Sequence, residues 1–260
     1  MIGGKKKQMA FSLACALLLG AFSLRRCVAA ESSVPAAETG ETLLPAGEVD
    51  KVLAELPALK SQGCVAARIV TDVDGLRPVK GQEGELLLDR PNRVLRKFTK
   101  PSPNFWLLDG TRLQEYVSKN NTLYINDFTL APRKLKLIQA AFTGDLKALQ
   151  GLFNIWVFKR PSAGQGKPVE YRFVLMQKPE ADKTLGFNKV QLRASEKDLF
   201  FHEIEIDMPP DKGDHTIERY FDIASVIRPS EKDFQEALGL PADAAKKVEQ
   251  VEDDPASKKE

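Results

Sequence analysis

Between residues 63 and 126 the chain alternates short apolar runs with turn-forming residues. The runs are rich in aliphatic and aromatic side chains, and the intervals contain Gly, Pro, Asn and Asp. Because the intervals are too short for a helical crossover, consecutive strands must be antiparallel and form a meander. The six strands that this rhythm predicts are 65–73, 84–90, 94–99, 104–108, 112–118 and 122–126.

Helical spacing of apolar residues occurs in three segments. Residues 48–60 have apolar side chains three and four positions apart, and Pro57 predicts a kink or an early end. Residues 135–152 have the same spacing with a break at Gly144, which predicts one broken helix or two short ones. Residues 231–238 are expected to form a short helix.

Strands resume after the central helical segment. Between residues 203 and 208, Glu or Asp occupies every odd position and Ile or Met every even one, which is typical of a sheet with one face in water. The five strands predicted here are 155–160, 169–177, 190–194, 199–208 and 216–225. The whole pattern predicts a mainly β fold with helices (α+β) and about eleven antiparallel strands.

Residues 1–30 have the three parts of a secretory signal peptide. Lys5-Lys6-Lys7 is a charged beginning, Met9 to Leu24 is an apolar stretch of 16 residues, and the small residues of Val28-Ala29-Ala30 predict cleavage after Ala30. The alternative is an uncleaved membrane anchor, but 16 residues are few against the ~20 that a bilayer core needs. We therefore expect a periplasmic protein.

The three cysteines give no disulfide framework. Cys27 would be a lipid-attachment site only with small residues just before it, and Arg25-Arg26 argue against this interpretation. Cleavage after Ala30 would leave Cys64 as the one cysteine, so the mature chain could form neither an internal disulfide nor a cysteine metal cluster. We expect Cys64 to be a small buried apolar residue rather than a nucleophile.

Composition divides the rest of the chain into three parts. Residues 31–47 predict a flexible lead-in, residues 48–241 a single domain, and the mostly charged or small residues 242–260 a disordered tail. The chain has 38 Lys and Arg against 36 Asp and Glu. Five of the bases and none of the acids lie in residues 1–30, so the remainder carries 33 bases against 36 acids, a net charge of −3. This charge gives no reason to expect nucleic-acid binding.

Candidate catalytic and metal-binding residues are few. His202 and His215 are the only histidines, and neither has a metal-ligand spacing; His202 lies on a predicted strand, and His215 in what looks like an exposed turn. Gly164-Gln165-Gly166 lacks the Lys and Ser/Thr of a phosphate loop and predicts a hairpin tip. No Gly-x-Ser-x-Gly elbow occurs. We therefore expect no enzyme, no metal and no cofactor.

One segment resembles a known family. Gly84 to Asn92, with the sequence Gly-Glu-Leu-Leu-Leu-Asp-Arg-Pro-Asn, resembles the strand-and-bend signature of the periplasmic outer-membrane lipoprotein carriers of the Lol pathway. In that family a Gly-x-Leu strand runs into Arg-Pro-Asn or a close variant. Leu107-Leu108-Asp109-Gly110, followed by Tyr116, resembles the family's Asp-Gly hairpin with its aromatic residue, and Tyr124 is the alternative aromatic. The specific part of the resemblance is residues 84–124.

The wider resemblance covers about residues 48–235 and implies both a fold and a task. The fold is an incomplete antiparallel β-barrel around an apolar cavity, with helices as a lid. The task is to take acylated lipoproteins from an inner-membrane transporter, shield their acyl chains, and pass them to an outer-membrane receptor. The matching arginine of the family hydrogen-bonds the lid backbone and holds the empty carrier shut, which implies this role for Arg90. The other interpretation of Arg90 is a residue that starts a bend and faces solvent.

The cavity is expected to be lined by alternate strand positions. In residues 93–98 either face carries a charge, because Arg96 lies between Val94 and Phe98 while Arg93 and Lys97 flank the other face. The cavity is then either smaller or suited at its rim to an anionic headgroup. The predicted lining residues are Leu86, Leu88, Val94, Phe98, Phe105, Leu107, Tyr124 and Trp156.

Three classes of function follow from these patterns. The first is a monomeric carrier of acylated lipoproteins or other lipids. The second is a lipid-binding or lipoprotein-sensing module of the same architecture, which handles another amphiphile or regulates a partner. The third is a hydrolase, which would need His202 or His215 clustered with a carboxylate in a pocket.

Overall fold

The computed structural model describes residues 34–60, 63–74, 79–91, 93–143, 145–161, 167–178, 189–207 and 215–252. The predicted signal peptide and the Gly164–Gly166 hairpin tip lie outside these residues. The described strands are β1 (Thr42–Leu43), β2 (Gly63–Asp74), β3 (Val79–Arg90), β4 (Arg93–Lys100), β5 (Asn104–Asp109), β6 (Arg112–Val117), β7 (Thr122–Leu130), β8 (Phe153–Arg160), β9 (Glu170–Gln177), β10 (Lys189–Ser195), β11 (Glu203–Asp207), β12 (His215–Ser225) and β13 (Ala245–Glu252).

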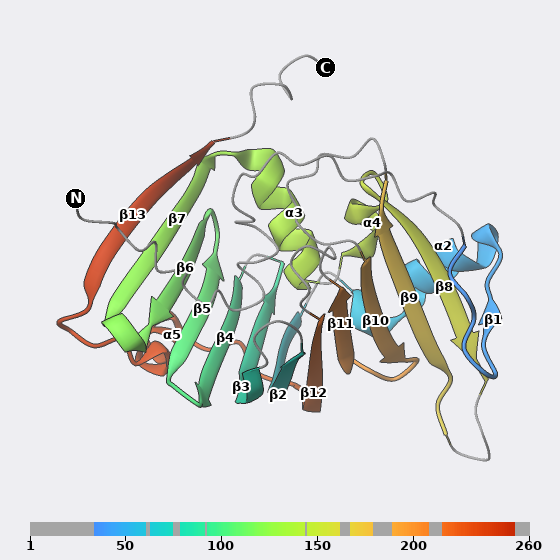
Figure 1. The fold of residues 1–260 in the computed structure, drawn as a ribbon, viewed down its shortest axis with the longest axis horizontal. Coiled ribbons are helices and arrows are strands. Elements are labelled where there is room, and N and C mark those ends of the chain that lie inside the picture. The colour runs from blue at the N-terminus through green and yellow to red at the C-terminus, as the bar shows by residue number, and fades with distance from the viewer. Residues whose placement is uncertain are drawn as a thin grey trace, which may run out of the picture.

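These strands form one open sheet in the order β1-β8-β9-β10-β11-β12-β2-β3-β4-β5-β6-β7-β13. Figure 1 shows the sheet bent into an arch, with β13 at one end and β1 at the other. The two meanders, β2 to β7 and β8 to β12, join where β12 pairs antiparallel with β2. The fold is therefore an incomplete antiparallel β-barrel with helices, and the eleven predicted strands are confirmed as β2 to β12.

The helices are also close to the predicted segments. They are α2 (Ala46–Glu55), the 3-10 turns η1 (Pro57–Leu59) and η2 (Ser118–Asn120), α3 (Pro132–Thr143), α4 (Leu146–Leu149) and α5 (Glu231–Leu238). Pro57 ends α2 as expected, and the central segment is two helices. α5 begins with a capping box, in which Ser230 and Asp233 bond each other's backbone N–H, and it ends at Gly239 in the left-handed region.

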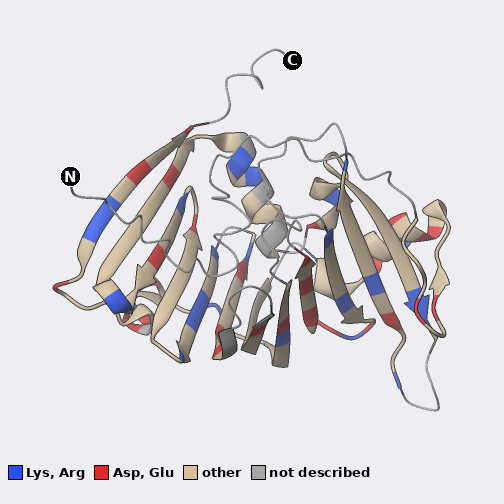
Figure 2. Ribbon diagram, viewed as in Figure 1, with Lys and Arg blue, Asp and Glu red and all other residues tan. Residues whose placement is uncertain are grey.

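Each face of the sheet has its own hydrophobic cluster. The inner face packs against the helical segments, where Ala58 of η1, Ile138 of α3 and Leu146 of α4 are buried in the larger cluster. Figure 1 shows α3 between the two ends of the arch. The outer face carries the smaller cluster, in which Phe234 and Leu238 of α5 cover part of β4 to β7. Residues of opposite charge are interspersed along the strands, as Figure 2 shows.

Two predictions about the chain ends are wrong. Residues 245–252 of the predicted disordered tail form β13, which pairs parallel with β7. Nearly every residue of β13 is exposed, so backbone hydrogen bonds, and not an apolar face, hold this strand in place. The lead-in is ordered from residue 34 onward and includes β1, which pairs with the edge of β8.

Candidate functional site

Arg90 lies at the end of β3 and connects three parts of the fold. Its side chain points to the inner face, as do those of Leu86 and Leu88, four and two residues before it. The Nη2 atom donates hydrogen bonds to the carbonyl oxygens of Ala58 in η1, at 2.8 Å, and of Leu199, at 3.1 Å. Arg90 is 3% exposed. The bend-only interpretation of a solvent-facing Arg90 is therefore wrong, and this residue does contact the backbone of a helical segment.

The surroundings of Arg90 are unusually apolar for a cation. Its guanidinium carbon lies 5.9 Å from the centre of the Phe200 ring, within cation–π range. Burial lowers the pKa of Arg90 to about 10. A guanidinium presents several donors in one plane, so it can bond carbonyls from two segments at once.

Five of the eight predicted lining residues face the inner side. Leu86, Leu88, Val94 and Phe98 are buried in the inner cluster. The registers Glu115 to Trp106 and Glu115 to Tyr124 place Tyr124 on the same face, where it is half-buried. The role of these residues as the wall of a ligand site stays a prediction.

The face predicted for the other three residues is wrong. Phe105 and Leu107 belong to the outer cluster under α5. Trp156 pairs with Val174, while the neighbouring Val157 and Phe173 belong to the inner cluster. Residues 105–108 and 155–158 are apolar at every position, so alternation could not show which face each side chain takes.

A charged pair lies within the apolar inner face. Arg96 of β4 forms an ion pair with Glu218 of β12, and both residues are buried. The Tyr220 hydroxyl donates to Glu218 Oε2 at 2.7 Å, and Arg96 Nη2 donates to the Tyr220 oxygen at 3.4 Å. Burial is the largest single influence and would lower the pKa of Arg96, but the charge and hydrogen bond of Glu218 and the interaction with Tyr220 together outweigh it and raise that pKa. Burial raises the pKa of Tyr220 well above its usual value.

This ion pair bears on the two interpretations of the charge on β4, which are a smaller cavity and a rim suited to an anionic headgroup. Its charge is already neutralised by Glu218, so it gives no support for an anionic headgroup at this position. The side chain lies 5.7 Å from the Phe98 ring and 5.9 Å from the Trp106 ring, and it takes up space on the inner face. This arrangement fits the interpretation of a smaller cavity.

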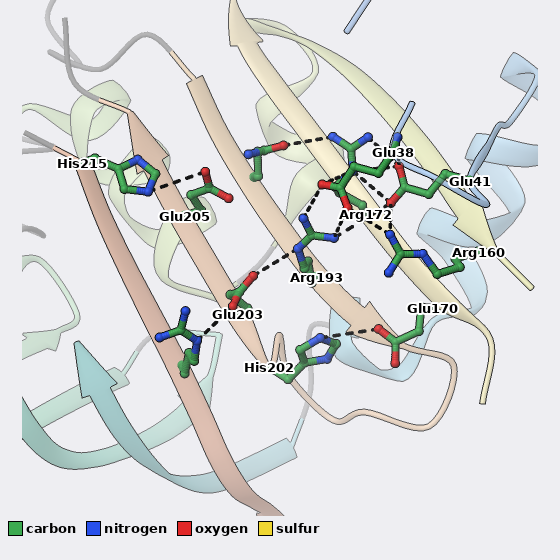
Figure 3. Close-up of polar contacts among 12 residues, drawn as sticks. Glu38, Glu41, Arg160, Glu170, Arg172, Arg193, His202, Glu203, Glu205 and His215 are labelled. Atoms are coloured by element: carbon green, nitrogen blue, oxygen red, sulfur yellow. Dashed lines mark hydrogen bonds and ion pairs between the residues drawn. The ribbon is translucent and has the colours of Figure 1, made fainter. Parts of the chain in front are cut away.

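A second buried ion cluster fixes the N-terminal segment on the outer face, as Figure 3 shows. Glu41 accepts from Arg172 Nη2 at 2.6 Å, and their side chains are 2% and 4% exposed. Glu38 pairs with Arg160 and Arg193 beside them. Burial is the largest single influence and would raise the pKa of Glu41, but the hydrogen bond and charge of Arg172 and the hydrogen bond from the Glu38 backbone together outweigh it, so that pKa is lowered. These contacts are the reason why the lead-in is ordered.

Sequence reasoning missed both ion clusters. Glu41 and Arg172 lie 131 residues apart, so no local spacing joins them. For the inner pair a signal existed: Arg96 lies between two inward apolar residues of β4, and Glu218 lies between the inward Thr216 and Tyr220 of β12. Each of these strands has one charged residue at a buried inward position, and the two charges are opposite. The two residues could therefore have been predicted to form an ion pair.

Both histidines contact carboxylates. His202 Nδ1 lies 2.7 Å from Asp198 Oδ2, and its Nε2 lies 3.6 Å from Glu170. His215 begins β12 instead of lying in an exposed turn, and its Nδ1 lies 2.6 Å from Asp207 Oδ1 on the paired strand. The histidines are thus partly buried residues in contact with carboxylates, and the close-up in Figure 3 includes them.

His215 also belongs to a group that the sequence spacing did not indicate. Possible ligand atoms of Glu205, Asp207 and His215 lie within 4.8 Å of one another. Lys189 lies 3.6 Å from Asp207, and its positive charge opposes cation binding there. The group lies on the outer face, opposite the Arg90 and Arg96 contacts. Partly exposed carboxylates of this kind do not by themselves define a metal site.

Cys64 is buried, as predicted. Burial raises the pKa of its thiol, and the nearby Asp89 adds to this effect. A thiol with a raised pKa is protonated at neutral pH and is a poor nucleophile. Among the described residues, no helix is long and apolar enough to cross a membrane.

Comparisons with known proteins find distant likenesses. The sequence matches no protein-family model and no curated protein. Similar solved structures include an uncharacterized conserved protein from Thermus thermophilus (10% identity, TM-score 0.48, covering 78% of this chain and 99% of that one). Others are a LolA superfamily protein from Nitrosomonas europaea (12%, 0.37, 71% and 96%) and a DUF1329 family protein from Desulfovibrio piger (8%, 0.39, 75% and 95%).

With identities of 12% or less and TM-scores below 0.5, these likenesses alone assign neither a function nor a ligand.

Proposed function

We propose that this protein is a periplasmic carrier that binds the acyl chains of lipoproteins on the inner face of the sheet and delivers them from the inner to the outer membrane. The observation that carries the proposal is the pair of hydrogen bonds from Arg90 to Ala58 and Leu199. Through them a strand of the open sheet is tied to a helical segment that packs on the apolar inner face. The resemblance of Gly84–Asn92 to the carrier family supports the same role.

The energetics of binding and releasing acyl chains are consistent with a contact of this kind. Each CH2 group of an acyl chain that leaves water for an apolar site contributes ~0.8 kcal/mol, so a carrier needs a dry face. It must also release its cargo, so the closed form must be stabilised by contacts that re-form when the cargo leaves. In this proposal the Arg90 hydrogen bonds are the contacts that form again after release, because they join β3 to the short turn η1 and to the backbone at Leu199.

The proposed cycle needs no covalent step. The helical segment moves away from the inner face, acyl chains enter, and the Arg90 bonds break. Release to a receptor is helped because the bonds form again in the empty protein. The inner-membrane transporter and the outer-membrane receptor are partners that the resemblance implies, and the predicted signal peptide fits their compartment.

The two tryptophans allow a direct test of the face that binds acyl chains. Trp106 is buried in the inner cluster, and Trp156 points to the outer face. Brominated acyl chains, which quench the fluorescence of tryptophans that they contact, should quench Trp106 in a Trp156→Phe variant. They should leave Trp156 unquenched in a Trp106→Phe variant. The reverse pattern, or equal quenching of both, would contradict binding on the inner face.

Delivery needs a separate measurement. A labelled lipoprotein should leave donor membranes with the carrier, remain with it in solution as a complex, and appear in acceptor membranes. The second candidate function, a lipid-binding or sensing module, is favoured by the buried Arg96–Glu218 pair, which places two charged groups within the apolar inner face. A sensor of this kind would stay attached to a protein partner and would move no lipoprotein between membranes.

A further inference from the structure

Besides Arg90 Nε, three buried polar atoms on the inner face lack hydrogen-bond partners among the described residues. They are the hydroxyl oxygens of Thr71 and Thr216 and the Nε atom of Arg96. Thr71 is 1% exposed and Thr216 is fully buried. Native proteins rarely leave buried donors and acceptors unpaired, because each loses its hydrogen bonds to water without replacement. A group of three in one place therefore needs an explanation.

The strand register and one ion pair bring these three residues close to Glu218. Thr71 of β2 lies directly opposite Glu218 of β12. Thr216 precedes Glu218 by two residues on β12, so it shares the same face and is a diagonal neighbour of Thr71. Arg96 reaches the same place through its ion pair with Glu218. The surrounding inner-face residues, such as Ile69 and Ile206, are apolar.

The charges at this place are already balanced. Arg96 carries one positive charge and Glu218 one negative charge, and Tyr220 donates its hydroxyl proton to the carboxylate. A further charged group would be buried here without a counter-charge, which is unfavourable. The complementary group must therefore be neutral. Arg96 Nε can only donate, and threonine hydroxyls can donate or accept, so a neutral carbonyl oxygen, which has two lone pairs, can accept from two of these donors at a time.

We propose that Thr71, Thr216 and Arg96 form a binding site for the carbonyl oxygen of an ester or amide that links an acyl chain to its cargo. This proposal rests on the proposed function, because it assigns the polar end of the same ligand. The acyl chain would lie along the apolar part of the inner face, and its linking carbonyl would accept hydrogen bonds beside the Arg96–Glu218 pair. The site would fix how far a chain can enter and would distinguish acyl from alkyl lipids.

The test uses two lipids that differ only in the presence of ester carbonyls. Diacylglycerol and its dialkyl ether analogue, with equal chains, are compared for binding to the wild-type protein by competition with a fluorescent acyl probe. The wild type should prefer the ester by about three- to tenfold, the range expected for one or two net hydrogen bonds. Thr71→Val and Thr216→Val should each reduce this preference, and the double variant should bind both lipids equally.

Thr99→Val is the matched control, because Thr99 is exposed and its hydroxyl already donates to the Glu83 carbonyl. It should keep the ester preference. The valine variants at Thr71 and Thr216 remove unpaired hydroxyls without changing volume, so their melting temperatures should be equal to the wild-type value or higher.

Each outcome has a distinct meaning. A wild type that binds both lipids equally would overturn the carbonyl site and leave the carrier proposal standing. An ester preference that persists in the double variant would also overturn the site. A wild type that binds neither lipid and no acyl probe would overturn the carrier proposal, and the site with it.

Discussion

Arg90 and Ala58 lie 32 residues apart in the chain, and a hydrogen bond of 2.8 Å joins the guanidinium of the first to the carbonyl of the second. The same Arg90 nitrogen reaches Leu199, which is 109 residues away. One side chain thus connects the N-terminal helical segment, the first meander and the start of the turn that leads into β11.

Replacing Arg90 should separate loading from release. Arg90→Leu removes the donors and keeps much of the apolar contact of the stem. The closed form should lose about 1.5–3 kcal/mol per hydrogen bond, less the desolvation that the charge no longer needs. Uptake of a labelled lipoprotein should persist, release to acceptor membranes should slow, and the variant should accumulate as a loaded complex.

Arg90→Lys is the conservative comparison for this experiment. Lysine keeps the charge but lacks the planar fork that serves two carbonyls, so it should restore release only in part. Equal transfer by the wild type, Arg90→Leu and Arg90→Lys would show that the contact does not control release.

Glu41 and Glu38 form a matched pair for the N-terminal segment. Glu41→Gln removes the buried counter-charge of Arg172 and leaves only the more exposed Glu38, 3.5 Å from Arg172 Nε, so it should lower the free energy of unfolding by about 3 kcal/mol. Glu38 is 39% exposed, so Glu38→Gln should cost less than about 1 kcal/mol. Urea unfolding measures both, and similar losses for the two variants would contradict the importance of burial.

The inner ion pair should be strongly coupled. Glu218→Gln leaves Arg96 buried with an uncompensated charge and should destabilise the protein by about 3–5 kcal/mol. In the double variant Arg96→Met/Glu218→Met, both charges are absent, so the loss should be smaller than in the single variant. A double variant that is less stable than Glu218→Gln would contradict this expectation. It would show that the ion pair contributes more to stability than is lost when one buried charge has no partner.

Stability should depend on the protonation of His202. Burial alone would lower the pKa of His202, but the hydrogen bond to Asp198 and the charges of Glu170 and Glu203 outweigh it and raise that pKa. Because the pKa in the folded state is above that of the unfolded chain, the stabilisation is fully present below the unfolded value of 6.5 and is lost as the pH rises through the folded value.

The measurement is a comparison of wild type and His202→Gln in urea at several pH values. The difference should be larger at about pH 5.5 than at about pH 8.5, by less than about 1 kcal/mol, because the side chain is about a third exposed and solvent screens its charge. A difference that is constant with pH, or that grows as the pH rises, would contradict the assignment.

Much of the architecture could be predicted because its cause is local. Turn residues between short apolar runs indicated the antiparallel meander, and the helix at 231–238 was predicted with the bounds that the structure has. The faces of β5 and β8 could not be predicted, since an unbroken apolar run has no period. β13 was missed because its charged residues make an edge strand whose stability comes from backbone pairing with β7.

The candidate site also has a part that a local motif indicated and a part that depends on long-range packing. Arg90 could be found because it lies in a short motif that resembles one of a known family, and the structure confirms that it contacts helical backbone. The Arg96–Glu218 pair depends on two strands that are far apart in sequence and lie near each other only after the two meanders join. Long-range pairs of this kind depend on the complete sheet order.

An open sheet leaves two edges where strands of other molecules could add. Here the first and last described strands occupy these edges: β1 pairs with β8, and β13 pairs with β7. β13 carries Lys246, Lys247 and Glu249 in mostly exposed positions, and charges on an edge strand discourage further pairing. The arch can therefore remain unclosed without offering an uncovered β7 on which polymers of the protein itself could grow, while the two residues of β1 cover only Phe158 and Lys159 of β8.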